Sequence, residues 1–144
     1  MRRVLPLFVV LIVACSTASS RPGVEFFARP GSIGPFSEAV RAGNIVFLSG
    51  MLGTDSTGRL APGGVGPETR QTLENIKAAL ARNGLTMNDV VKCTVFLADI
   101  AEWGAMNQVY ATYFPESKPA RSAVGGTGLV RNARVEIECI AAIR

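Results

Sequence analysis

The chain contains 144 residues and no histidine, which limits the chemistry that its side chains can perform. Without histidine, Ser-His and Cys-His nucleophilic machinery is excluded, so acid–base chemistry must use carboxylates, lysine, tyrosine or water. Cysteine is also sparse, and three cysteines without any histidine disfavour a zinc site. We therefore expect no bound metal.

Long hydrophobic runs are absent except at the N-terminus. Residues 4–14 (VLPLFVVLIVA) follow two arginines and form an uninterrupted apolar run, too short to span a bilayer but typical of a secretory signal. We expect residues 1–14 to be a signal peptide, residues 15–23 a tether and residues 24–144 one folded domain. The folded part is then predicted to lie outside the cytoplasm, in the periplasm or cell envelope.

The end of this run, IVAC, resembles a bacterial lipobox, in which cleavage precedes the cysteine and lipid is added to its sulfur. The resemblance predicts lipidation at Cys15 and a membrane anchor there. Ordinary signal cleavage near Ala18 or Ser20 is the alternative. Removal of residues 1–14 also removes two arginines, so the formal charge falls from +4 to +2. That balance gives no reason to expect a nucleic-acid partner.

Strand and helix patterns alternate twice along the rest of the chain, which predicts an α+β domain with helices on one side of a sheet. Gly66 as a cap and Pro67 at the first helical position mark the first helix, which ends at Asn83. Asp99 and Glu102 have capping-box spacing for a second helix. The expected strands cover residues 24–28, 43–52, 89–99, 119–124 and 133–143.

Several side chains have an expected environment from these patterns. Cys93 and Cys139 fall within strands and are expected to be buried, inert thiols. A disulfide in an oxidising compartment is the alternative, possible only if their strands are neighbours. Trp103 and Met106 belong to the apolar stripe of the second helix and are expected to be core or subunit contacts. Arg82 belongs to a solvated face of the first helix.

Two charged residues within apolar strand patterns are the candidates for chemistry. Arg121 lies in PARSAVGG and Glu136 in ARVEIECIAAI, where an isolated charge is costly. The planar fork of arginine matches a carboxylate, so a buried arginine needs either an internal acid or an anionic ligand. The pattern alone leaves a structural Arg121–Glu136 pair and a ligand site both open.

Four segments, in order, resemble the RidA (YjgF) family of imine deaminases. They are IGPFSEAVRAGNIVFLSG (33–50), ETRQTLENIKAALARNGL (68–85), DVVKCTVFLADI (89–100) and PARSAV followed by VEIECIAA. The resemblance runs from about residue 24 to the C-terminus. It implies a chorismate-mutase-like fold, a mixed sheet with two helices packed on one face, assembled as a barrel-like homotrimer with its sites between subunits.

The resemblance also assigns site residues. Arg121 stands at the family's substrate-binding arginine and Glu136 at its water-positioning glutamate. The positions that would line the substrate cleft are Phe36, Ser49, Gly50, Asn107 and Ala123. For Ser49 a hydrogen bond to a backbone group at a strand end is the alternative, and for Asn107 a cap or bridge within the helix layer.

Two of these positions depart from the family. Ala123 stands where cysteine is common, and the exchange should do little harm because that position is thought to act through its backbone N–H. Phe36 replaces a tyrosine, which keeps an apolar wall but loses one polar contact. Lower activity or a larger, more apolar substrate would follow.

The implied activity is cofactor-free hydrolysis of a small 2-imino acid to a 2-oxo acid and ammonia. Arg121 would hold the substrate carboxylate and Glu136 the attacking water. The alternative is a trimeric protein that binds small carboxylates without turning them over.

Overall fold

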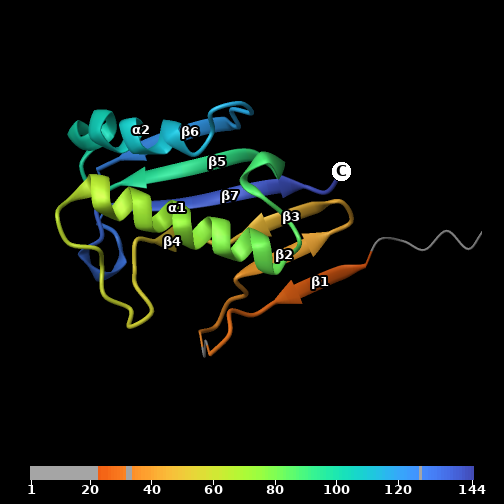
Figure 1. Ribbon diagram of the computed structural model, residues 1–144. Helices are drawn as coiled ribbons and strands as arrows, with labels where there is room; N and C mark the ends of the chain where they lie inside the picture. The colour runs from red at the N-terminus through yellow and green to blue at the C-terminus, as the bar shows by residue number, and fades with distance from the viewer. Residues whose placement is uncertain (1–22, 32–33, 127) are drawn as a thin grey trace, which may run out of the picture.

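The computed structural model describes residues 23–31, 34–126 and 128–144, which form a mixed sheet with two α-helices on one face (Figure 1). This confirms the predicted fold class. The expected signal peptide and Cys15 lie outside the described residues. Within the described ranges no helix is long and apolar enough to cross a membrane.

In chain order the elements are β1 (Val24–Phe27), β2 (Ala39–Ala42), β3 (Ile45–Leu48), β4 (Met51–Leu52), α1 (Val65–Arg82), η1 (Met87–Asp89), β5 (Val90–Leu97), η2 (Ile100–Glu102), α2 (Trp103–Thr112), β6 (Ala120–Gly125), η3 (Val130–Asn132) and β7 (Val135–Ala142).

The last strand of the chain lies in the middle of the sheet. The strand order is β1-β2-β3-β7-β5-β6, and β4 pairs with β7 beyond the end of β3. All pairings are antiparallel except β5 with β6. A parallel pair needs a crossover connection, and α2 provides it. The chain thus brings segments from its two ends into contact at β3 and β7.

The long helix α1 packs its apolar stripe against the sheet. Leu73, Ile76 and Leu80 recur at helical spacing and are completely buried. The helix begins two residues earlier than predicted, at Val65 with Gly64 as N-cap. Pro67 therefore lies within the first turn, where its missing N–H breaks no helical hydrogen bond.

The predicted strand over residues 43–52 is two strands in the structure. Ser49 and Gly50 separate β3 from β4, and the Ser49 amide donates to the Glu38 carbonyl oxygen at 3.0 Å. The interruption places a polar residue and a glycine at the junction, beside β7. Both residues line a cavity there.

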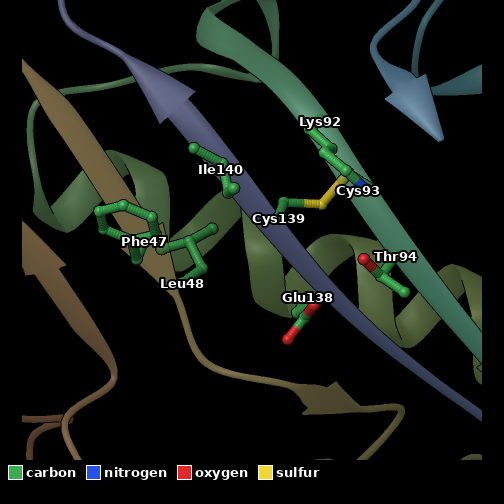
Figure 2. A pocket seen from close by; sticks show the side chains of 8 residues that line it. All are labelled: Phe47, Leu48, Lys92, Cys93, Thr94, Glu138, Cys139 and Ile140. Atoms are coloured by element: carbon green, nitrogen blue, oxygen red, sulfur yellow. A yellow bond between two sulfur atoms is a disulfide. The ribbon is translucent and has the colours of Figure 1, made fainter. Parts of the chain in front are cut away.

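Cys93 of β5 and Cys139 of β7 form a disulfide, so the expectation of inert thiols was wrong (Figure 2). The two residues are directly opposed in the antiparallel pair, with Cα atoms 4.1 Å apart. Directly opposed residues in antiparallel strands approach closely enough for a bridge. Local patterns contain no information about this pairing, because the two cysteines are 46 positions apart in sequence.

Other expected environments are corrected in part. Met106 is completely buried, as predicted, whereas Trp103 is 42% exposed and is not a core residue, so for Trp103 only the predicted subunit contact stays open. Arg82 is more than a solvated side chain, because its Nε and a terminal nitrogen donate to the two carboxylate oxygens of buried Glu38 at 2.9 and 2.6 Å. This ion pair joins the end of α1 to the start of β2.

The predicted capping box at the second helix does not form. The Asp99 carboxylate accepts from the Ala101 amide at 2.9 Å and caps the short 3-10 turn η2 instead. Glu102 pairs with Arg134 at 2.6 Å, so its carboxylate ties the start of α2 to the segment before β7.

Candidate active site

A cavity of about 840 Å³ beside β4 contains four of the predicted site residues. Its walls come from the loop before β2, the junction of β3 and β4, the loop after β4, the C-terminal half of α1 and the start of β7. Phe36, Ser49, Gly50 and Glu136 all line it. These four residues come from two of the four segments that carry the family resemblance, and the wall formed by α1 comes from a third.

Glu136 lies directly against Gly50. A side-chain carbon placed on Gly50 would overlap the Glu136 carboxylate, so glycine leaves the space that this carboxylate occupies. Within the described part of the chain, the Glu136 carboxylate has no hydrogen bond and no ion pair. Burial raises the pKa of Glu136, and the charge of Glu138 on the same strand raises it further. An unpaired, partly desolvated carboxylate suits a general base.

Ser49 and Phe36 also line the cavity, Ser49 with a hydrogen-bonded hydroxyl and Phe36 with an apolar ring. The Ser49 hydroxyl donates to the Ser37 carbonyl oxygen at 2.7 Å, which is the backbone hydrogen bond considered as the alternative. Ser49 still lines the cavity, so the hydrogen bond fixes a cavity wall. Phe36 is 67% exposed, and its ring presents an apolar surface without a hydroxyl.

The sequence patterns missed a further cation at this cavity. Arg131 lines it and donates to the Gly58 carbonyl oxygen at 3.2 Å. Its φ is 61°, and that of Asn132 is 56°, so two successive non-glycine residues lie in the left-handed region. Such a turn is uncommon and could not be read from hydrophobic periodicity.

The remaining predicted residues lie elsewhere, around β6 and α2. Arg121 and Ala123 are on β6, opposite Cys93 and Val95 of the parallel strand β5. Asn107 lies on α2, and its side chain makes no hydrogen bond within the described ranges, which argues against a cap or bridge.

Arg121 contacts two aromatic rings. Its guanidinium carbon lies 4.5 Å from the ring centre of Tyr110 and 5.6 Å from that of Trp103. Both rings belong to α2, at positions that share a face with Asn107. No carboxylate pairs with Arg121 among the residues that the structure describes. The structural Arg121–Glu136 pair left open by the sequence is therefore absent from this part of the chain.

Arg121 and Glu136 emerge on opposite faces of the sheet. Arg121 aligns with Cys93, and Cys93 aligns with Cys139, so these three side chains point toward the helices. Glu136 is three positions before Cys139 on β7, and strand side chains alternate, so Glu136 points to the other face. Arg121 and Glu136 of one chain therefore face away from each other.

The helix-free face of the sheet has its own shallow cavity of about 210 Å³ (Figure 2). Phe47 and Ile140 contribute its apolar wall, and Lys92, Thr94 and Glu138 its polar groups. In the described ranges, no cluster of three or more cysteine, aspartate or glutamate side chains could hold a metal ion.

A family model and individual related proteins both match this chain. The family model described as Endoribonuclease L-PSP matches residues 26–143. A 2-iminobutanoate/2-iminopropanoate deaminase of Mus musculus is 47% identical over 113 residues, which are 78% of this chain and 84% of the mouse protein. Reactive Intermediate Deaminase A, chloroplastic, of Arabidopsis thaliana is 40% identical over 139 residues, 96% of this chain and 74% of the plant protein.

The fold is also found in a solved structure. The crystal structure of the YjgF gene product from E. coli superposes with a TM-score of 0.77 at 35% sequence identity, covering 83% of this chain and 99% of that one.

Proposed function

Because the chain belongs to the RidA (YjgF) family, which the Endoribonuclease L-PSP model describes, we propose that it hydrolyses small 2-imino acids to 2-oxo acids and ammonia. The observation that carries this proposal is the pair of uncompensated charges. Arg121 has no acidic partner and Glu136 has no cationic partner within the described residues. A substrate that is both a carboxylate and an electrophile gives each charge a use.

The proposed reaction needs no change of oxidation state. Arg121 binds the substrate carboxylate through two N–H donors. Glu136 takes a proton from water as the water oxygen bonds to the imine carbon, and the nitrogen receives this proton as the C=N bond becomes a single bond. The hydroxyl of the resulting carbinolamine then gives its proton to Glu136, which passes it to the nitrogen as the C–N bond breaks and the C=O bond forms. The raised pKa of Glu136 supports this double role, because the carboxyl holds a proton more readily between the two steps. The products are a 2-oxo acid and ammonia.

A complete site then requires two copies of the chain. We propose a homotrimer in which one copy contributes Arg121, Asn107 and Ala123, and its neighbour contributes Glu136 with the cavity around Gly50. The support is the placement of Arg121 and Glu136 on opposite faces of one sheet. Exposed apolar side chains on the chain, among them Phe47 and Val124, are consistent with a surface that becomes covered on assembly.

The activity test uses imines made in place. An amino-acid oxidase generates short-chain imino acids, semicarbazide traps them, and the protein competes with the trap. The parent protein should suppress the adduct, whereas Arg121→Ala and Glu136→Gln should not. Arg70→Ala is the matched control, because it removes an arginine from an exposed position of α1. Absence of suppression together with Arg121-dependent binding of 2-oxo acids would replace the deaminase with the carboxylate-binding alternative.

Subunit mixing tests the shared site. Arg121→Ala and Glu136→Gln chains, unfolded together and refolded, should recover activity that neither variant has alone. Random assembly restores about a quarter of the sites, since each site needs an intact arginine from one chain and an intact glutamate from another. A mixture as inactive as its two components would place both groups of a site on one chain.

We also propose that the chain is exported and anchored to a membrane through lipid on Cys15. The apolar run over residues 4–14 supports export, and the disulfide between Cys93 and Cys139 supports an oxidising compartment. Cys15→Ser should release the protein from the membrane fraction. Unchanged partition would indicate simple secretion or retention by other means.

A further inference from the structure

Arg121 carries a charge that the fold does not neutralise. The side chain is half-buried on β6 and has neither an ion pair nor a hydrogen bond in the part of the chain that the structure describes. Its contacts are instead the rings of Tyr110 and Trp103, at 4.5 and 5.6 Å from the guanidinium carbon. An arginine is thus stabilised here by ring faces in place of an acid.

The two kinds of partner have different consequences for binding. A carboxylate would occupy the N–H donors of Arg121 and cancel its charge, so a substrate carboxylate would have to displace it. An aromatic ring attracts the cation through its quadrupole and accepts no conventional hydrogen bond in doing so. The donors of Arg121 therefore remain available.

The two rings are held in different ways. Tyr110 is 6% exposed and packs on Phe114 with ring centres 4.8 Å apart. Burial raises the pKa of Tyr110 to about 12, although the Arg121 charge opposes the shift, so the ring faces the cation as a neutral phenol. Trp103 is 42% exposed at the start of α2. Tyr110 is the buried ring of the two, and Trp103 is the exposed one.

We propose that Trp103 and Tyr110 are positioning residues, an aromatic clamp that holds Arg121 as an uncompensated cation with its N–H donors directed to the substrate carboxylate. The proposal rests on the proposed function and names how its anion anchor is built. The clamp acts through Arg121, so it affects how tightly the carboxylate is bound more than how fast the bound imine reacts.

The test changes Trp103, because this exposed side chain can be replaced without opening the core. Trp103→Leu keeps apolar bulk and removes the π system, whereas Trp103→Phe keeps a smaller ring. Phe26→Leu is the matched control, because it makes a similar exchange at a residue of β1 that is 71% exposed. The full-length parent and each variant are titrated with 2-oxobutanoate by calorimetry, and kcat and KM are measured with the imine-trapping assay.

We expect Trp103→Leu to weaken 2-oxobutanoate binding roughly 3- to 30-fold, the range of one cation–π contact at a partly desolvated site. Trp103→Phe should recover part of this loss, and Phe26→Leu should bind as the parent does. KM should rise with the dissociation constant while kcat changes much less, because the carboxylate is held equally before and during the reaction.

Three results would overturn the clamp. They are parental binding by Trp103→Leu, a loss in Trp103→Phe as large as that in Trp103→Leu, or a fall in kcat at unchanged KM. Each of these requires an active parent that binds 2-oxobutanoate. A parent that neither binds 2-oxobutanoate nor suppresses imine trapping would overturn the proposed function itself, and it would do so before any variant is made.

Discussion

Opening the disulfide between Cys93 and Cys139 should remove a large share of the stability of this domain. The bridge joins residues 46 positions apart. In the chain-entropy description, closing a loop of this length restricts the unfolded state by an amount worth about 4 kcal/mol at 25 °C. Natural domains are stable by only about 5–15 kcal/mol, so reduction should shift the unfolding midpoint by a wide margin.

The assay compares the parent with and without a phosphine reductant in denaturant and thermal unfolding. A Cys15→Ser background leaves only Cys93 and Cys139 to count, so unfolded protein should show no free thiol before reduction and two afterwards. We expect the melting temperature to fall by roughly 10–25 °C on reduction. All samples need equal protein concentration, because assembly would couple stability to concentration.

The matched control is the double variant Cys93→Ala and Cys139→Ala. It should unfold at the same midpoint with and without reductant, and somewhat below the reduced parent, because two buried sulfur atoms are lost from the core. A reduced parent with two titratable thiols and a stability within about 1 kcal/mol of the oxidised protein would refute the entropic reasoning.

Three further predictions concern the cavity and its supports. Gly50→Ala should leave the fold intact but displace the Glu136 carboxylate, because the new methyl group would occupy its place; imine turnover should fall while thermal unfolding stays near the parent. Glu138→Gln should lower the pKa of Glu136, since the like charge that raises it is gone, and a pH–rate profile should show its acid limb moved to lower pH. Arg82→Met should lower the free energy of unfolding by about 2 kcal/mol in denaturant, because Glu38 keeps a buried charge without its partner. This loss is smaller than for a fully buried ion pair, since the Arg82 side chain is 40% exposed.

Each of these has a contrary outcome. Parental turnover by Gly50→Ala would show that the carboxylate works from another position. An unmoved acid limb in Glu138→Gln would assign that limb to a different group. For Arg82→Met, the double variant with Glu38→Gln is the control, and a double variant no more stable than Arg82→Met would exclude the stranded charge as the cause.

The elements that local patterns predicted are those in which one periodicity runs uninterrupted. In β7 the residues Val135, Ile137, Cys139 and Ala141 are buried, as their alternation with polar neighbours predicts. In α1 the apolar stripe is likewise confirmed. The break at Ser49 and Gly50 was missed because a strand-like composition continues through it, and only pairing with β7 shows where the ladder stops.

Sequence reasoning could name candidate site residues but could not predict how they are arranged in space. Their charge within apolar strand patterns picked out Arg121 and Glu136, and the family resemblance gave each a role. Neither has a charged partner among the residues that the structure describes. Which face of the sheet each one occupies depends on the register of β5 with β6 and β7, and no local pattern contains that register. The disulfide could not be predicted for the same reason, because it depends on the pairing of β5 with β7. The position of Trp103 over Arg121 was hidden as well, because an apolar stripe does not distinguish a core residue from one that covers a cation.

The separation of Arg121 and Glu136 onto opposite faces of the sheet makes activity a property of concentration in the proposed assembly. In that assembly a single chain, newly folded and still alone, would hold half of one site on each side and would be inactive. Activity per chain would therefore fall on dilution below the dissociation range of the oligomer and return on concentration, without any change in the fold of the chain. In the proposed assembly, local accumulation of the chain would therefore be enough to switch the activity on.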